Sequence, residues 1–215
     1  YDASQSIPEF DRFIEQITCG DAELAEYLQA MWGMILLGTV VEEKIFFLYG
    51  NGANGKTTLM DIFSGILGSD LVNNIRGDQL SNLESSTLAD LRGRRLALAT
   101  DSMKRDLAVS AVKPLSSKGA VVGRSLYKNA VSFQPSHTIV AYTNVLPRLD
   151  HPDPAIWRRI VVVPFRFQVQ QKDYDLAARI LRNEGAGILA WGIEGARKLL
   201  ERGGLPACEA VDTAK

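Results

Sequence analysis

Apolar residues in the first forty positions recur at steps of three and four, which is the spacing of helices with one buried face. The pattern runs from Pro8 to Leu37 and breaks at 19–21, so we expect two helices, with Asp21 capping the second. Four short apolar runs, typical of buried parallel strands, lie at 44–49, 95–101, 137–143 and 160–165. Helical spacing at 58–67 and towards the end of the chain completes an α/β pattern.

The region between the second and fourth runs gives weaker patterns. Apolar spacing over 106–115 predicts a helix that ends near Pro114. The mixture of glycines and β-forming residues over 119–133 predicts a hairpin with its turn at or near Lys128. A single helical turn is expected at 153–157, directly before the last strand.

The end of the chain is again helical. We expect one helix that ends at Gly185 and a second that closes at Gly203 and Gly204, together forming a small lid or bundle. Residues 69–87 give no clear prediction. We therefore divide the chain into an N-terminal helical segment, an α/β core and a C-terminal helical segment, at 1–43, 44–168 and 169–215.

A glycine-punctuated turn directly follows the first strand and matches the pattern G-x-x-x-x-G-K-[ST]. In such a loop the backbone N–H groups converge on phosphate oxygens, the lysine reaches the β- and γ-phosphates, and the hydroxyl can ligate Mg²⁺. The strand before it and the helix after it are the context that the motif requires. We expect a nucleoside triphosphate with Mg²⁺ to bind at Gly50, Asn51, Gly52, Ala53, Asn54, Gly55, Lys56, Thr57 and Thr58.

Polar and charged residues stand at the ends of the other strands. Asp101 ends the second run, where a carboxylate beside a phosphate loop can hold Mg²⁺ and polarise the attacking water. Asn144 follows the third run, where an amide can contact the γ-phosphate or that water. Alternatively, Asp101 only starts a turn after its strand, and Asn144 only closes a turn before Pro147. Arg158 and Arg159 precede the fourth run, and they either contact the end of the short helix or supply an arginine finger to a neighbouring subunit.

Charge is unevenly distributed along a chain whose net charge is only −1. Residues 1–43 carry nine acids against the single base Arg12, whereas residues 92–128 carry nine bases against two acids. The basic block is either a solvated face or a contact surface for a polyanion. The apolar runs are too short to cross a bilayer, so we expect a cytoplasmic protein that does not contact membranes.

The order of these features resembles the superfamily 3 helicase domain found at the carboxyl end of phage and plasmid primases, which is related to poxvirus primase-helicases. The resemblance spans most of residues 9–200. The matching segments are 47–50 with 54–57, 91–96, 124–128, 143–144 with 146–148, and 155–159 with 163–165.

The resemblance implies an AAA+-type P-loop ATPase core, with a central parallel sheet flanked by helices, that assembles as a ring, usually of six subunits. It also implies translocation on single-stranded DNA to unwind duplex. Position by position, it implies that Lys56 and Thr57 hold the phosphates and Mg²⁺. Asp101 would be the Walker B acid and Asn144 the sensor amide. Arg158 or, with a slight preference, Arg159 would be the finger in trans. The residues that would grip DNA on or near the hairpin are Lys118, Arg124 and Lys128.

This sequence departs from the family pattern at two places. Family members tend to carry Glu where Asp101 stands, and a shorter carboxylate would ligate Mg²⁺ indirectly and activate water less well. After the lysine at Lys113, the family pattern Leu-Thr-Gly-Gly-Asp reads here as Leu-Ser-Ser-Lys-Gly over 115–119. The acid is missing ahead of the hairpin, and Lys118 adds positive charge there.

The leading hypothesis is an ATP-driven DNA helicase motor from a replication protein of a phage, plasmid or integrated element. Its expected partners are single-stranded or forked DNA and further copies of itself in a hexameric ring. Because the sequence begins at Tyr1 rather than methionine, we expect a piece of a longer protein. The resemblance implies that this protein also contains a primase or another replication domain. One alternative is a nucleotide-dependent DNA-binding module that loads replication proteins and unwinds little. A small-molecule kinase is less favoured, because nothing resembles an acceptor-binding lid.

Overall fold

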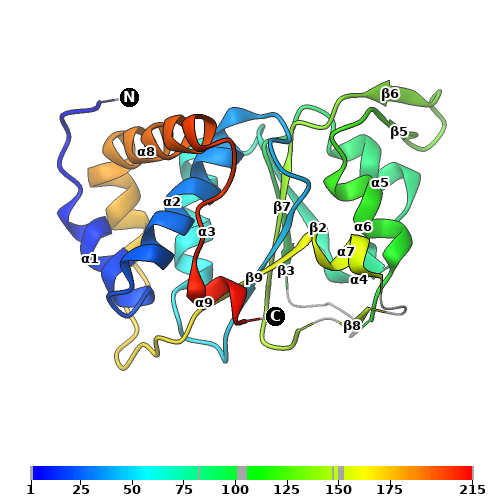
Figure 1. The fold of residues 1–215 in the computed structure, drawn as a ribbon. Coiled ribbons are helices and arrows are strands. Elements are labelled where there is room, and N and C mark those ends of the chain that lie inside the picture. The colour runs from blue at the N-terminus through cyan, green and yellow to red at the C-terminus, as the bar shows by residue number, and fades with distance from the viewer. Residues whose placement is uncertain (1, 82, 101–105, 147, 150–152, 215) are drawn as a thin grey trace.

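The computed structural model describes residues 2–81, 83–100, 106–146, 148–149 and 153–214 of the 215-residue chain. At its centre is a sheet of five parallel strands that lies between two layers of helices (Figure 1). The strands are β1 (Ile45–Tyr49), β2 (Val72–Arg76), β3 (Leu96–Thr100), β7 (Thr138–Thr143) and β9 (Ile160–Pro164). Their order across the sheet is β2-β3-β7-β1-β9, so β7 separates β1 from β3.

The four strands expected from apolar runs are β1, β3, β7 and β9, while β2 was not predicted. The reason lies in its position at one edge of the sheet, where a strand needs fewer apolar residues. Its centre is the polar pair Asn73 and Asn74, and only Ile75 is fully buried. A sequence pattern of this kind carries too little periodicity to indicate a strand.

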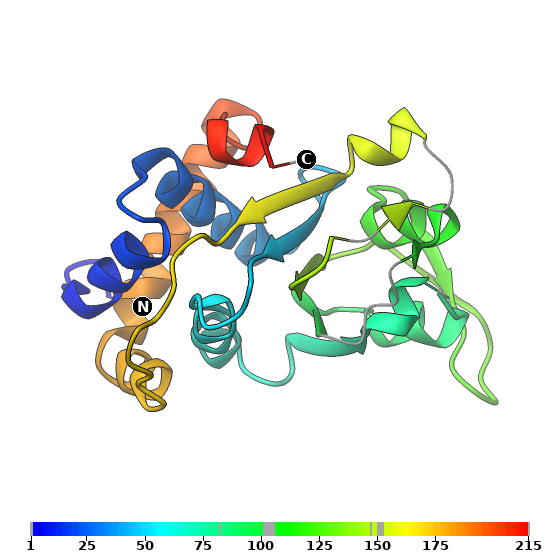
Figure 2. The same ribbon diagram turned by 90° about the horizontal axis from the view of Figure 1, so that it is seen from below.

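Figure 2 shows that the two layers of helices lie on opposite faces of the sheet. One layer contains α1 (Pro8–Ile17), α2 (Ala22–Leu37), α3 (Lys56–Leu67), α8 (Leu176–Arg202) and α9 (Glu209–Asp212). The other contains α4 (Gly77–Ser81), α5 (Ser85–Asp90), α6 (Val109–Ser116) and α7 (Pro154–Trp157). Alternate residues of β1 enter the two cores, with Phe46 and Leu48 in the first and Ile45 and Phe47 in the second. The expected α/β fold with helical segments at both ends is confirmed.

The two N-terminal helices break where the sequence predicts. The Asp21 carboxylate caps α2 by accepting a hydrogen bond from Leu24 N at 3.0 Å. The start of α1 is capped from a distance instead: Glu184 of α8 accepts hydrogen bonds from Glu9 N at 2.9 Å and Phe10 N at 2.8 Å. This contact fixes the beginning of the chain to the C-terminal helix.

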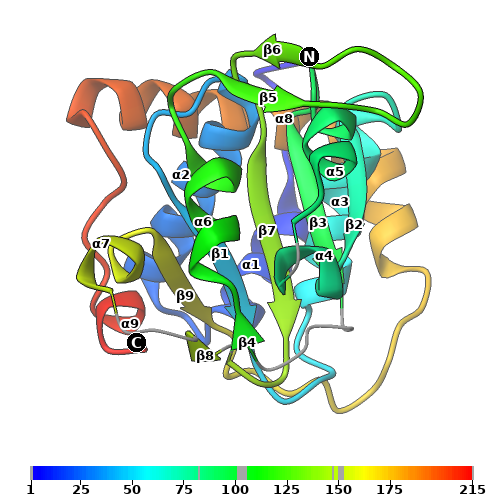
Figure 3. The same ribbon diagram turned by 90° about the vertical axis from the view of Figure 1, so that its right-hand side faces the viewer.

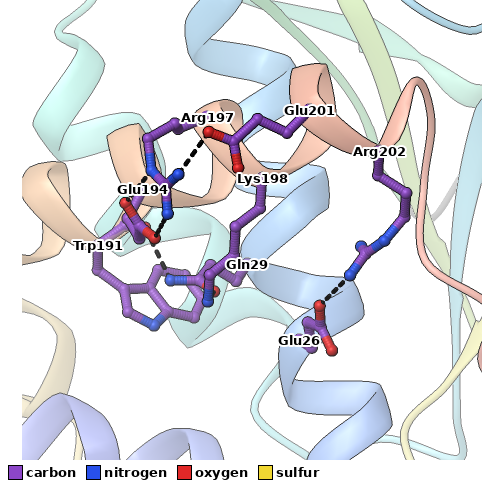
Figure 4. Close-up of polar contacts among 8 residues, drawn as sticks. All are labelled: Glu26, Gln29, Trp191, Glu194, Arg197, Lys198, Glu201 and Arg202. Carbon is purple, nitrogen blue, oxygen red and sulfur yellow. Dashed lines mark hydrogen bonds and ion pairs between the residues drawn. The ribbon is translucent and has the colours of Figure 1, made fainter.

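The C-terminal helical segment differs from the expectation, because a single helix α8 runs through Gly185 to Arg202. An interior glycine costs a helix only about 1 kcal/mol, and packing of α8 on α2 offsets it. Gly192 and Gly195 allow this close approach, since a Cβ on either would overlap Trp32 or the Gln29 backbone. Figure 4 shows the polar contacts along this interface, among them Gln29 Nε2 donating to Trp191 O at 3.0 Å and the ion pair between Arg202 and Glu26.

Two short sheets complete the fold. β4 (Asp106–Leu107) pairs in parallel with β8 (Arg148–Leu149), and β5 (Val121–Gly123) pairs antiparallel with β6 (Val131–Phe133) in the expected hairpin. The helix expected to end near Pro114 continues to Ser116, because the proline removes only its own N–H bond and Leu115 stays buried. None of the helices in the described part of the chain combines the length and apolar character that a membrane span requires.

Candidate functional site

The loop at residues 50–55 leads from β1 into α3 in a conformation that its glycines make possible. Gly52 and Gly55 have φ angles of 91° and 85°, in the left-handed region that most residues avoid. A Cβ on Gly50 would overlap the Asn54 side chain and the carbonyl of Phe165. Glycine is therefore required for backbone conformation at Gly52 and Gly55, and for space at Gly50.

Lys56 is buried at the base of this loop, with only 5% of its surface exposed. Its Nζ donates to Gly50 O at 2.7 Å and to Asn54 Oδ1 at 3.0 Å. Asn54 Nδ2 in turn donates to Phe165 O at 3.3 Å, at the end of β9. Because a buried ammonium group is costly without acceptors, these contacts hold the positive charge in a defined position inside the loop.

The start of α3 faces the same region and favours negative charge. The helix is 12 residues long, and its first turn contains no acidic residue. Its first N–H groups lack partners within the helix, and its dipole places partial positive charge at this end. Together with Lys56, the helix N-terminus suits the binding of phosphate groups.

A cavity of about 840 Å³ opens next to the loop. It is lined by most of the nucleotide-binding residues expected from the sequence, namely Gly52, Ala53, Asn54, Gly55, Lys56, Thr57 and Thr58. Asn144, which follows β7, lines the same cavity. Gly50 and Asn51 line a neighbouring hollow of about 360 Å³ instead. The structure therefore places the glycine-rich loop and the expected sensor amide at one site.

Two groups of cavity residues were not expected from the sequence. The first is the face of α1 formed by Phe13, Gln16 and Ile17. The second is the segment 167–177 after β9, which is tied to the loop because Val169 N donates to Ala53 O at 2.7 Å. A possible signal was the polar run at 168–172, since β9 lies beside β1 and delivers the following residues to the loop.

Of the two residues expected to act on the γ-phosphate and water, Asn144 is within the described residues. Asn144 is exposed, and the turn that carries it is fixed by Thr143 Oγ1, which donates to Val145 O at 2.7 Å. Asp101 lies outside the described residues. The strand before it, β3, ends at Thr100 and pairs with β7, the strand that carries Asn144.

Arg158 and Arg159 lie at the opposite end of the sheet from the loop. They immediately precede β9, whose first residue Ile160 is opposite Ile45, the first residue of β1. The whole of β1, five residues or roughly 16 Å of strand, therefore separates them from the loop of the same chain. Neither arginine therefore reaches the glycine-rich loop of its own chain.

The two arginines differ in their contacts. Arg159 Nη2 forms an ion pair with Glu43 Oε2 at 2.7 Å, and its Nη1 donates to Ser116 Oγ at 3.0 Å. Arg158 is exposed, and no hydrogen bond or ion pair of its side chain occurs within the described residues. Partial burial alone would raise the pKa of Glu43, but the Lys118 N–H and the guanidinium of Arg159 outweigh it and lower that pKa.

The hairpin residues Lys118, Arg124 and Lys128 are also exposed and also lie away from the loop. Figure 3 shows the hairpin at the end of the sheet from which the parallel strands start, opposite the arrowhead of β7. Lys118 N contacts Glu43 Oε1 at 3.3 Å, so the beginning of the hairpin segment is close to Arg159. Among the described residues, the expected site residues thus divide into two groups, one at each end of the parallel strands.

This strand order, with a glycine-rich loop between a central strand and a helix, defines a P-loop nucleoside triphosphatase fold of the AAA+ type. The chain belongs to the family described as "Family of unknown function (DUF5906)", whose sequence profile matches residues 48–159. That range begins in β1 and ends at Arg159, so it contains both groups of site residues.

Similar proteins include viral proteins named helicase and primase. The putative helicase L207/L206 of Acanthamoeba polyphaga mimivirus is 31% identical over 152 residues, covering 67% of this chain and 16% of the relative. Primase D5 of Fowlpox virus is 26% identical over 162 residues, covering 71% of this chain and 20% of the relative. The chain therefore spans only about a fifth or less of the length of these relatives.

Among solved structures, the apo C-terminal region of NrS-1 has a similar fold. Its TM-score is 0.68 at 14% sequence identity, and the match covers 91% of this chain and 46% of that chain. At this identity the likeness concerns the fold alone.

Proposed function

We propose that this chain is an ATP-hydrolysing motor of the superfamily 3 helicase type that moves along single-stranded DNA. The observation that carries the proposal is the cavity at the carboxyl ends of the parallel strands, which is lined by the glycine-rich loop, Lys56 and Asn144. The names of the viral relatives, helicase and primase, support a role in DNA replication.

ATP and Mg²⁺ fit the residues at this site. The strained loop offers backbone N–H groups, Lys56 offers a held ammonium, and the exposed Thr57 offers a hydroxyl beside them. Bound Mg²⁺ would neutralise charge that develops on the phosphates, with Thr57 and Asp101 as its proposed protein ligands. Asn144 would orient the attacking water or the γ-phosphate from the end of β7.

A complete site requires a second subunit in this proposal. Both arginines lie about the length of a strand away from the loop of their own chain, so a finger must come from a neighbour. Arg158 is the better candidate, because Arg159 is engaged by Glu43 and Ser116 whereas Arg158 is exposed. A ring, hexameric as in the resembling family, would repeat this arrangement at every interface.

The other end of the sheet, where the parallel strands start, would contact DNA. Lys118, Arg124 and Lys128 are exposed on or next to the hairpin, and electrostatic contact with phosphates needs no particular base sequence. The chain covers a fifth or less of its viral relatives, which supports a domain that is linked to a primase or another replication domain. We place such a protein in the cytoplasm of a bacterial cell or infected host.

The test of this proposal is ATP hydrolysis with and without single-stranded DNA. We expect hydrolysis to require Mg²⁺ and to rise with DNA, and we expect Lys56→Ala to abolish it while the protein stays folded. The matched control is Lys113→Ala, which removes an exposed lysine on α6 and should leave the rate without DNA unchanged. Activity that survives Lys56→Ala would contradict the proposed site.

A further inference from the structure

The seven-residue loop 124–130 between β5 and β6 presents two large apolar side chains to solvent. Tyr127 is 96% exposed and Leu126 is 75% exposed. Of the large hydrophobic side chains that the structure describes, Tyr127 is the most exposed. Burial in the core therefore does not explain the aromatic ring at this position.

The backbone at Tyr127 adopts a conformation that costs energy. Tyr127 has a φ of 60°, in the left-handed region where a non-glycine residue is disfavoured by about 1 kcal/mol. The turn around it is closed by Lys128 N donating to Ser125 O at 3.1 Å and by Arg124 Nε donating to Lys128 O at 3.0 Å. Strained positions of this kind cluster at binding sites.

The base of the hairpin is firmly anchored. Arg124 N donates to Ser85 O at 3.0 Å, at the start of α5. Gly123 lies so close to the backbone of Ala89 that a Cβ would overlap it. The exposed tip is therefore carried on a fixed support.

The surroundings of the tip are positive. Arg124 and Lys128 flank the ring and are exposed, and residues 107–149 contain no Asp or Glu. An aromatic ring flanked by cations complements a single-stranded nucleic acid, because a base can stack on the ring while the phosphates meet the cations. The carboxylates of an acidic peptide would satisfy the charges, but they do not stack on the ring as every nucleobase can.

We propose that Tyr127 stacks on a base of single-stranded DNA while Arg124 and Lys128 contact its phosphates. The inference rests on the proposed function and adds to it an apolar contact that is insensitive to salt and tolerant of sequence, since every base has a flat face. Leu126 extends the same apolar surface beside the ring.

The test is the affinity for an oligothymidine strand measured by fluorescence anisotropy over a range of salt concentrations. We expect Tyr127→Ala and Tyr127→Gly to weaken binding about tenfold at every salt concentration. Tyr127→Phe keeps the ring and should bind like the wild type. Lys128→Ala should instead lower the slope of log affinity against log salt by about 0.7, as expected for one lost contact with a single strand.

Two features of the design keep the outcome clear. Tyr127→Gly suits the positive φ, so loss of binding by this variant cannot come from backbone strain. Leu200→Ala removes a different exposed apolar side chain, on α8, and should leave binding unchanged.

The stacking proposal is overturned if Lys128→Ala reduces affinity and slope but both ring-deleting variants bind like the wild type; the DNA-binding function would then still stand. It is also overturned if Tyr127→Phe binds as weakly as Tyr127→Ala, because the hydroxyl would then be the contact. Should the wild type fail to bind the strand at all, the proposed function itself fails.

Discussion

At the scale of single residues, Arg158 and Arg159 are neighbours in sequence with different surroundings. Arg158→Ala should lower ATP hydrolysis about a thousandfold without lowering the melting temperature, because it removes an exposed charge that, in the proposed ring, acts on the nucleotide of a neighbouring subunit. Arg159→Ala should instead destabilise the fold by about 1–2 kcal/mol, because its partly buried ion pair with Glu43 is lost. Thermal unfolding and hydrolysis rates of both variants check this, and equal effects of the two substitutions would contradict the distinction.

His137 predicts a pH dependence of stability. Burial lowers its pKa from 6.5 to about 4, although the hydrogen bond to the carbonyl of Leu115 acts in the opposite direction. The unfolded chain therefore takes up a proton at a higher pH than the folded chain does. The His137 contribution is fully present above pH 6.5 and is lost as the pH falls towards 4, by about 3 kcal/mol in total.

Urea unfolding at several pH values between 4 and 7 measures this effect. The control is His137→Gln, which keeps an N–H donor but does not titrate. The stability advantage of the wild type over this variant should shrink over that interval, and an advantage that is independent of pH would show that His137 titrates normally.

The residues of the glycine-rich loop could be predicted from the sequence because a short motif specifies local geometry, backbone included. The contacts of Arg159 could not be predicted, since Glu43 and Ser116 approach it only after β1, α6 and β9 have come together. For the same reason the α1 residues at the cavity escaped prediction: helical spacing identifies a buried face but not what that face is packed against.

At the scale of elements, the capping of α1 by Glu184 predicts a stability effect between distant segments. Glu184→Ala should cost about 2–3 kcal/mol in the free energy of unfolding, because two backbone N–H groups, one of them buried, lose their acceptor. Glu184→Gln keeps one acceptor oxygen and should recover part of the loss. Denaturant unfolding measures both, and an unchanged midpoint in Glu184→Ala would show that the contact contributes nothing.

Most helices and buried strands could be predicted from periodicity, because each buries an apolar face. Two of the exceptions illustrate why. β2 is a polar edge strand, and α8 continues through Gly185 since its stability comes from packing on α2 rather than from intrinsic propensity. Elements were thus missed or divided where tertiary contacts override local preference.

At the scale of the whole molecule, the two groups of described site residues lie at opposite ends of the parallel strands. The strand order that separates them was not readable from apolar runs, which identify strands but not their neighbours. This separation predicts complementation between subunits. Lys56→Ala and Arg158→Ala should each be inactive alone, whereas a 1:1 mixture should regain activity, since roughly a quarter of its interfaces would combine an intact loop with an intact arginine.

The measurement for this prediction is the hydrolysis rate of the mixture after the subunits have been allowed to exchange. Lys56→Ala mixed with Lys56→Ala/Arg158→Ala is the matched control and should stay inactive, because it contains no intact loop. A mixture of the two single variants that also stays inactive, although light scattering shows that it assembles, would exclude Arg158 as the finger.

The central claim is that ATP hydrolysis at the glycine-rich loop drives movement along DNA. Its most direct test is strand separation of a forked DNA by the protein, followed by fluorescence as one labelled strand is released. We predict separation that requires ATP and Mg²⁺ and that disappears in Lys56→Ala, although this variant still binds the fork. A protein that binds the fork and hydrolyses ATP without separating the strands would contradict the claim and would favour a nucleotide-dependent loading module.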